Sequence, residues 1–360
     1  MLLCKSALRF ASGHAVEESL CAFCPRCPCP ESLLANNPLL QISSPLYIPL
    51  VYRREFLRHC GAVAAASALP LRAAPPEKPR VAVTIDDPAT TVSPSLSWKA
   101  ANRALLDALE KWNLKVALFV CGMRLDSAQG KELLGQWDEA GHSICNHSYS
   151  HFNFNSPKTT YDDFVADFDH NEALIKPYRR FTRLFRYPFL KEGDTPEKRD
   201  SFRDLLKEKG YAVGHVTIDN SDWYVDDRLQ ARLQKQPAAD SQPYADYLVP
   251  HLLDRAVFYR QLALEVLGRE IPHTLLLHYR MVNALYLADV LSAFAEKGWQ
   301  WIDAKRAFDD PVFKSRPQIV PAGESLVWAL AKETGRYNDR LRYPGEDDVY
   351  EKPKMDSLGL

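Results

Sequence analysis

A regular alternation of short apolar segments with amphipathic ones is the feature that most constrains this chain. Seven segments have the length and composition of buried strands, at residues 81–85, 115–120, 142–147, 183–187, 211–218, 273–278 and 299–304. Each interval holds a stretch with helical periodicity, at residues 95–112, 127–141, 159–178, 195–210, 242–268 and 284–298. Such alternation favours parallel strands joined by right-handed crossovers. Seven units predict an α/β fold with a closed or nearly closed barrel, and an open doubly wound sheet is the alternative.

The segment before this alternation has the pattern of an export signal. Residues 52–58 read YRREFLR, and a modestly apolar run of small residues and a Pro-rich exit follow. This order predicts a twin-arginine signal peptide over residues 51–74, cleaved near Ala73 or Ala74, and a periplasmic or secreted protein. The apolar run is too short for a stable membrane span. A short buried helix after a basic turn is the alternative.

Residues 1–50 do not fit this interpretation, because a signal should begin near the start of the chain. No methionine lies between Met1 and Met123. We therefore expect a non-Met start near Val51, which makes residues 1–50 a translation artefact or a disordered leader. The body is then a domain over residues 78–310 and a C-terminal extension over 311–360, packed on the barrel with a mobile end.

The cysteines divide between the leader and the body. Four of them have ligand-like spacing but lie in a Pro-rich stretch with no second ligand pair, so we expect no metal or cluster site there: Cys21, Cys24, Cys27 and Cys29. Cys121 and Cys145 each end an apolar run, which predicts buried free thiols. An exported protein could instead join them in a disulfide.

Composition and charge exclude some classes of function. The chain is 46% hydrophobic and 25% charged, as in a globular protein. The net charge is −1, and the first 73 residues carry seven Lys/Arg and four Asp/Glu, which leaves −4 on the rest. This acidic body, without a Lys/Arg run, predicts that nucleic acid is not the partner.

Ionisable side chains gather where five of the predicted strands end. The chemistry of β/α barrels lies at this end of the strands. The residues concerned are Asp86 and Asp87, His147 and His151, Arg186, Asp219 with Asp222, and His278. Taken singly, these are weak signals: paired aspartates are common turn residues, and H-x-x-x-H occurs by chance. Their occurrence in order, each after its own strand, predicts a shared site.

One carboxylate and two imidazoles make a three-ligand site for a divalent metal with open positions. Asp87, His147 and His151 are the expected ligands. Such a metal lowers the pKa of bound water and generates a nucleophile near neutral pH. Because adjacent side chains on a regular strand point to opposite faces, the strand must break at Asp86–Asp87 for both acids to serve one site.

The remaining groups suit proton transfer. Asp86 could accept the proton of the water, and the metal and Arg186 would keep Asp86 ionised. His278 could protonate the leaving group. Asp222 could orient His278 and support its cationic form.

Five segments together resemble the motifs of a known family. They are TIDD at 84–87, HSYSH at 147–151, RYPF at 186–189, DNSDW at 219–223 and LLLH at 275–278. This set, spanning residues 80–305, resembles the polysaccharide deacetylases, the NodB-homology family of carbohydrate esterases (family four). The resemblance implies a distorted, incomplete TIM-like (β/α)7 barrel with parallel strands.

The resemblance also implies a role for each matching residue. It implies that Asp86 is the base, that Arg186 holds it, and that His278 is the acid. The ion bound by Asp87, His147 and His151 would be Zn2+ most commonly, with Co2+ or Ni2+ as alternatives. The other implied roles are the Phe189 N–H as oxyanion donor, Leu276 beside the acetyl methyl, and Asp222 and Trp223 tuning the acid and walling the groove.

Two features depart from the family pattern or leave its substrate open. Pro88 stands where the family often has Gly, and it biases Asp87 towards an extended conformation. Aromatic residues in the motif loops could form a sugar-stacking surface or simply close the barrel: Phe152, Phe154, Tyr187, Trp223 and Tyr224.

The expected reaction is hydrolytic removal of N-acetyl or O-acetyl groups from an acetylated oligo- or polysaccharide. A metal-dependent amidohydrolase acting on small amides is one alternative, and a deep closed pocket would favour it. A carbohydrate-binding barrel without activity is another, which the intact set of site residues disfavours. The glycan, the native metal and the oligomeric state stay open.

Overall fold

The computed structural model describes residues 78–341 and 347–360. The leader and the twin-arginine signal predicted for residues 1–74 lie outside this part of the chain. Within the described residues, no helix is long and apolar enough to cross a membrane.

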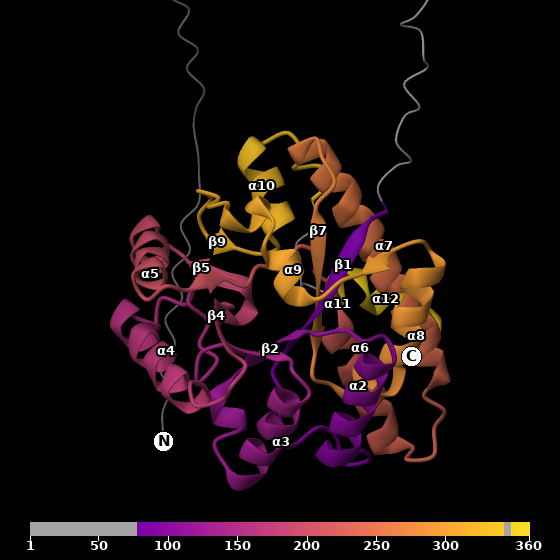
Figure 1. The fold of residues 1–360 in the computed structure, drawn as a ribbon. Coiled ribbons are helices and arrows are strands. Elements are labelled where there is room, and N and C mark those ends of the chain that lie inside the picture. Colours follow the sequence, from indigo (N-terminus) through magenta and orange to yellow (C-terminus); the bar gives the residue numbers. More distant parts are fainter. Residues whose placement is uncertain (1–77, 342–346) are drawn as a thin grey trace, which may run out of the picture. The chain divides into compact units, whose positions relative to one another are not determined.

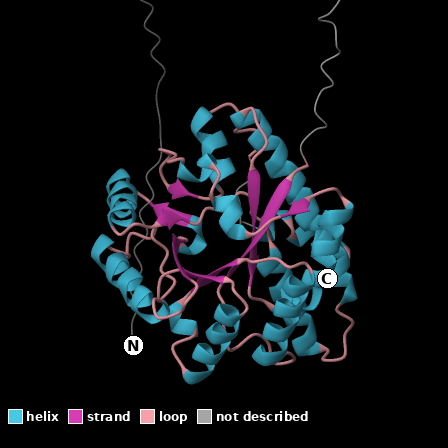
Figure 2. Ribbon diagram, viewed as in Figure 1, coloured by secondary structure: helices cyan, strands magenta, loops and turns pink. Residues whose placement is uncertain are grey.

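Seven strands form one sheet in which every pairing is parallel (Figure 2). They are β1 (Arg80–Asp86), β2 (Ala117–Val120), β3 (Ser143–Asn146), β4 (Phe181–Phe185), β6 (Ala212–Val213), β7 (Pro272–His278) and β8 (Gln300–Trp301). The order is β6-β4-β3-β2-β1-β7, and β8 also pairs with β1. The sheet curls into an incomplete (β/α) barrel, so the predicted fold class is confirmed.

A single segment joins the two edges of this sheet. Ala212 pairs with Leu184 of β4, whereas Ile218 bridges Leu275 of β7. Between them, Gly214 passes so close to the Phe119 ring that a Cβ would lie 2.3 Å from it. The strand predicted over 211–218 is therefore divided into two short pairings with different neighbours.

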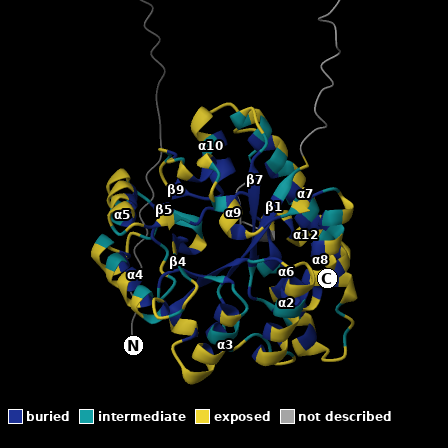
Figure 3. Cartoon of the chain, viewed as in Figure 1, coloured by how far each residue is buried: buried dark blue, intermediate teal, exposed yellow. Residues whose placement is uncertain are grey.

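Helices surround the strands (Figure 1) and bury their apolar faces against them (Figure 3). They are α2 (Trp98–Lys111), α3 (Ala128–Glu139), α4 (Tyr161–Ile175), α5 (Pro196–Glu208), α6 (Asp222–Lys235), α7 (Gln242–Leu267) and α8 (Met281–Glu296). Four of them begin at a side-chain cap, in which a hydroxyl oxygen accepts from an N–H of the first turn: Ser97, Ser127, Thr160 and Thr195. Six of these helices match predicted ones, and α6 does not.

The C-terminal extension adds small elements to the barrel. The strand β9 (Ala322–Gly323) pairs antiparallel with β5 (Lys191–Gly193) in a second sheet. The helical pieces of the extension are η3 (Pro311–Lys314), α10 (Leu326–Thr334), α11 (Asp347–Tyr350) and α12 (Lys352–Ser357). Three further short pieces lie within the barrel domain: η1 (Gly122–Arg124), η2 (Pro188–Leu190) and α9 (Ala304–Phe308). The helix predicted near 324–334 corresponds to α10, which packs against α7. We expected a mobile chain end; α12 buries Met355, and the mobility itself stays a prediction.

Candidate functional site

The predicted residues meet in one cavity of about 480 Å3 at the carboxyl ends of the strands. Nine of the eleven residues given a role line it: Asp86, Asp87, His147, His151, Tyr187, Phe189, Trp223, Leu276 and His278. Asp219, which also follows a predicted strand, lines it too. Arg186 and Asp222 are fully buried and contact cavity residues from behind. The structure therefore brings all eleven residues together.

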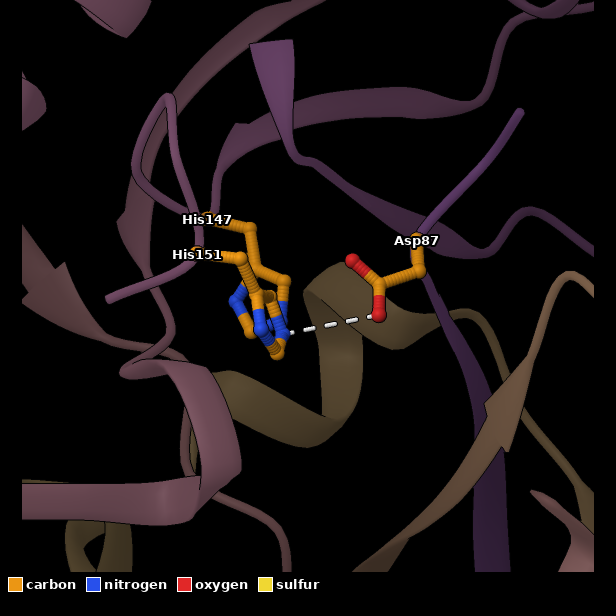
Figure 4. Close-up of side chains that lie close together, drawn as sticks. All are labelled: Asp87, His147 and His151. Atoms are coloured by element: carbon orange, nitrogen blue, oxygen red, sulfur yellow. Dashed lines mark ion pairs between the residues drawn. The ribbon is translucent and has the colours of Figure 1, made fainter. Parts of the chain in front are cut away.

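Asp87, His147 and His151 point towards one place (Figure 4). One ligand atom from each lies within 4.8 Å of the others, and His151 Nε2 lies 3.5 Å from Asp87 Oδ2. The Oδ1 atom of Asp87 is buried and has no hydrogen-bond partner in the structure. A carboxylate and two imidazoles at this spacing, with an unpaired buried oxygen, fit a divalent cation of the zinc type.

The protonation of both histidines suits ligation. His147 Nδ1 lies 2.8 Å from the carbonyl oxygen of Arg186, so Nδ1–H donates and Nε2 is left as the ligand atom. Burial lowers the pKa of His147 to about 4 against the opposing charge of Asp87. Burial likewise lowers the pKa of His151 to about 4. Both rings are therefore neutral near pH 7.

Unusual backbone conformations aim these ligands. Asp87, Ser148, His151 and Phe189 all have φ between 57° and 61°, a region that non-glycine residues rarely adopt. At Asp87 this conformation, which differs from the extended one expected from Pro88, ends the strand, and Asp86 and Asp87 both line the cavity. The predicted break at Asp86–Asp87 is confirmed.

Asp86 is held in a buried ion pair with Arg186. Their Oδ1 and Nη1 atoms lie 2.6 Å apart, and Nη1 also donates to the Thr84 hydroxyl at 2.9 Å. The guanidinium lies 3.9 Å from the centroid of the Phe119 ring and its Nε donates to the Gly214 carbonyl. Arg186 is thus fixed from three sides.

Burial raises the pKa of Asp86 to about 6, and the charge of Arg186 offsets only part of that rise. We expected the metal and Arg186 together to keep Asp86 ionised; in the chain without an ion, Arg186 acts against a large effect of burial, because both groups are removed from water. With a pKa of about 6, Asp86 is mostly ionised at neutral pH and can still take up a proton, as a general base must.

His278 lies on the other wall of the cavity and is paired with Asp222. The Nδ1 atom donates to Asp222 Oδ1 at 2.7 Å, and the backbone N–H of His278 donates to Oδ2 at 2.7 Å. Burial alone would lower the pKa of His278, but the carboxylate of Asp222 outweighs it and raises the pKa to about 9. The imidazole is therefore a cation at neutral pH, ready to donate a proton.

The aromatic residues divide between the two predicted roles. Phe154 and Tyr187 belong to a buried aromatic cluster, as expected for core residues. Phe152 and Phe189 are exposed, and the Phe189 ring lies edge-on to His151 with centroids 4.5 Å apart. Phe189 and Trp223 both line the cavity. Phe189 and Trp223 could thus serve as a stacking surface, and Tyr187 of the buried cluster also lines the cavity.

Several site residues were not predicted. Asn283 Nδ2 donates to Asp222 Oδ2 at 2.6 Å and so helps to fix the acid pair. Asp167 accepts from the backbone N–H groups of Tyr149 and Ser150 and so fixes the loop between His147 and His151. Arg124 Nη2 lies 3.4 Å from Asp87 Oδ2. An asparagine or aspartate inside a helix gives no sequence signal of these contacts.

Both cysteines of the described region are buried free thiols, as predicted by their positions at the ends of apolar runs. Cys121 donates weakly to the Tyr149 carbonyl at 3.1 Å. Burial raises the pKa of the Cys121 thiol to about 11, so it is inert near pH 7.

Comparison with known proteins gives one family and several distant structures. The model of the polysaccharide deacetylase family matches residues 73–214. No curated protein sequence matches the chain. A peptidoglycan deacetylase, PdaC, from Bacillus subtilis is 19% identical with a TM-score of 0.44, over 66% of this chain and 93% of the other.

Two further solved structures have similar scores. A family 4 carbohydrate esterase from Streptomyces lividans, in complex with acetate, is 20% identical over 64% of this chain and 95% of the other, with a TM-score of 0.42. A CE4 family pseudoenzyme from Bacillus anthracis is 18% identical over 65% and 67%, with a TM-score of 0.43.

Proposed function

We propose, from the match of the polysaccharide deacetylase family model to residues 73–214, that the protein is a metal-dependent hydrolase that removes acetyl groups from an acetylated carbohydrate. The observation that carries the proposal is that one cavity holds a candidate metal site, a candidate base and a candidate acid on different residues. A candidate metal triad lies between a buried carboxylate with a pKa of about 6 and a paired histidine with a pKa of about 9.

The ion would be held by Asp87, His147 and His151, with Zn2+ as the expected metal and Co2+ or Ni2+ as alternatives. When bound, it would polarise the acetyl carbonyl and acidify a water molecule. Asp86 would take the proton of that water at the carboxylate oxygen nearest His147. Arg186 would hold Asp86 in place and compensate its charge.

His278 would donate its proton to the leaving nitrogen or oxygen of the sugar as the acyl bond breaks. Asp222 would stabilise the imidazolium beforehand and keep Nε2–H directed to the cavity, because Nδ1 is engaged with the carboxylate. The Phe189 backbone N–H would supply a donor to the oxyanion, and Leu276 would face the acetyl methyl.

Acetate release tests this function. The full chain, stripped of metal and reloaded with Zn2+, would be incubated with acetylated chitooligosaccharides, peptidoglycan, acetylated xylan and small acetamides, beside Asp86→Asn. Zn2+-dependent acetate release from a glycan, lost in Asp86→Asn, is the expected result. Release from small acetamides alone would make the protein an amidohydrolase of small amides. Glycan binding without release would make it a binding barrel.

We also propose export through a twin-arginine signal, because YRREFLR precedes an apolar run and an Ala-rich site. The mature N-terminus of the native protein, determined by mass spectrometry, should fall near Ala73 or Ala74. Peptides from residues 1–50 in the precursor would contradict a start near Val51.

A further inference from the structure

A buried ion pair lies in the wall of the same cavity, outside every motif described above. Lys191 Nζ, from β5, pairs with Glu324 Oε1, from the loop after β9. The side chains are only 16% and 6% exposed, and both line the cavity together with Asp86 and His278. The pair therefore faces the space in which a substrate would lie.

The C-terminal extension delivers Glu324 to this wall. Gly323 lies where a Cβ would be 1.9 Å from the carbonyl oxygen of Leu190, so only glycine allows this approach. The Glu324 N–H donates to the same oxygen at 2.8 Å, and Glu324 has φ of 72°. Residues 323–324 are thus docked on the segment that follows Phe189, in a conformation that a solvent-facing loop would not need.

The chemistry of the pair suits hydroxyl groups. A buried ion pair adds little net stability, since removing both charges from water offsets their attraction. An ammonium and a carboxylate side by side, however, offer strong donors and strong acceptors in one place. Neighbouring hydroxyls on a sugar ring each donate and accept, so they complement both groups at once.

We propose that Lys191 and Glu324 form a subsite that binds ring hydroxyls of the acetylated sugar and so select a carbohydrate over a small acetyl compound. This inference rests on the proposed function and deepens it. The pair takes no part in proton transfer, which Asp86 and His278 carry out. Its loss should therefore weaken the handling of glycans and leave a hydroxyl-free acetyl ester unaffected.

The test compares two substrates in the Zn2+-loaded full chain. The double variant Lys191→Met/Glu324→Gln removes both charges, so neither is left buried without its partner. On the acetylated glycan that the wild type cleaves fastest, we expect kcat/KM to fall about ten- to hundredfold, mainly through KM, as for lost hydrogen bonds to charged groups. With 4-nitrophenyl acetate, kcat/KM should be unchanged.

Lys198→Met is the matched control. Lys198 is 17% exposed and pairs with Asp194 at 2.9 Å, but it does not line the cavity. The Lys198→Met variant should keep the wild-type ratio of activity on the glycan to activity on 4-nitrophenyl acetate. If the double variant fails to fold, Glu324→Asp keeps the charge but shortens its reach, and it should lower glycan activity alone.

The outcomes separate the two proposals. A loss on the glycan but not on the ester supports the subsite. If the double variant loses both activities equally, or loses neither, the subsite is overturned. Acetate release by the wild type would still uphold the deacetylase in that case. If the wild type releases acetate from no glycan, the proposed function fails and the subsite fails with it.

Discussion

At the scale of single residues, the site assigns different chemistry to two adjacent aspartates. Asp86 lies against Arg186 in the core, whereas Asp87 turns towards His147 and His151 through its positive φ. Burial would raise the pKa of Asp87, but the nearby histidines and Arg124 lower it overall. Neighbours in sequence thus have pKa values shifted in opposite directions.

Replacing the base should separate binding from chemistry. We expect Asp86→Asn to lower kcat by about a hundred- to ten-thousandfold, the range for a lost general base. Zn2+ affinity, measured by competition with a chromogenic chelator, should stay within a few-fold, since Asp86 is not a ligand. A comparable loss of Zn2+ binding would assign Asp86 to the metal instead.

The acid pair predicts the alkaline limb of the pH profile. His278 must be protonated to act, so kcat should fall as the pH rises through its pKa of about 9. In Asp222→Asn the group that raises this pKa is gone, and the limb should move to lower pH. An unmoved limb with intact Zn2+ binding would show that another group is the acid.

At the scale of elements, the segment that pairs with both β4 and β7, residues 212–218, depends on Gly214 having no side chain. Gly214→Ala would place a Cβ 2.3 Å from the Phe119 ring, which also packs on Arg186. We expect a loss of about 1–3 kcal/mol in the free energy of unfolding, measured by urea denaturation. Gly135→Ala in α3, where nothing lies within 4 Å, should instead stabilise by about 0.5–1 kcal/mol.

Elements with strong periodicity were predictable from sequence, and those set by distant contacts were not. The seven strands and six helices follow from apolar runs, Ser/Thr caps and closing glycines. The helix α6 begins inside the DNSDW motif, so its polar first turn indicated a loop. The strands β5 and β9 have only three and two residues, and their pairing depends on Gly323 meeting Leu190.

The candidate site was predictable to the extent that strand ends converge in a barrel. That rule places Asp86, His147, Arg186 and His278 together without coordinates. It could not supply Glu324, because the two-residue strand before it, β9, belongs to a second sheet and gives no sequence signal. The close approach of Gly323 to Leu190 brings Glu324 in. Nor could the rule give the direction of the pKa shift of Asp86, because that depends on how deeply the carboxylate is buried.

At the scale of the whole molecule, metal binding should stabilise the fold. Any ligand that binds only the folded chain adds about 2.7 kcal/mol at a hundredfold excess over its Kd. For a chain of this size we expect Zn2+ to raise Tm by about 4–5 °C. His151→Ala should abolish that rise, and Mg2+, which prefers oxygen ligands, should produce none. A rise that survives in His151→Ala would place the ion elsewhere.

The order of the site along the chain bears on how it is made. The three candidate metal ligands are synthesised by residue 151, but β1 gains its second neighbour only when β7 arrives, almost two hundred residues after β1 begins. Such distant pairing slows folding, because a long loop must close before the contact forms. The candidate cation ligands are therefore translated well before His278, the proposed acid. The set of residues proposed for proton transfer is complete only after the cation site.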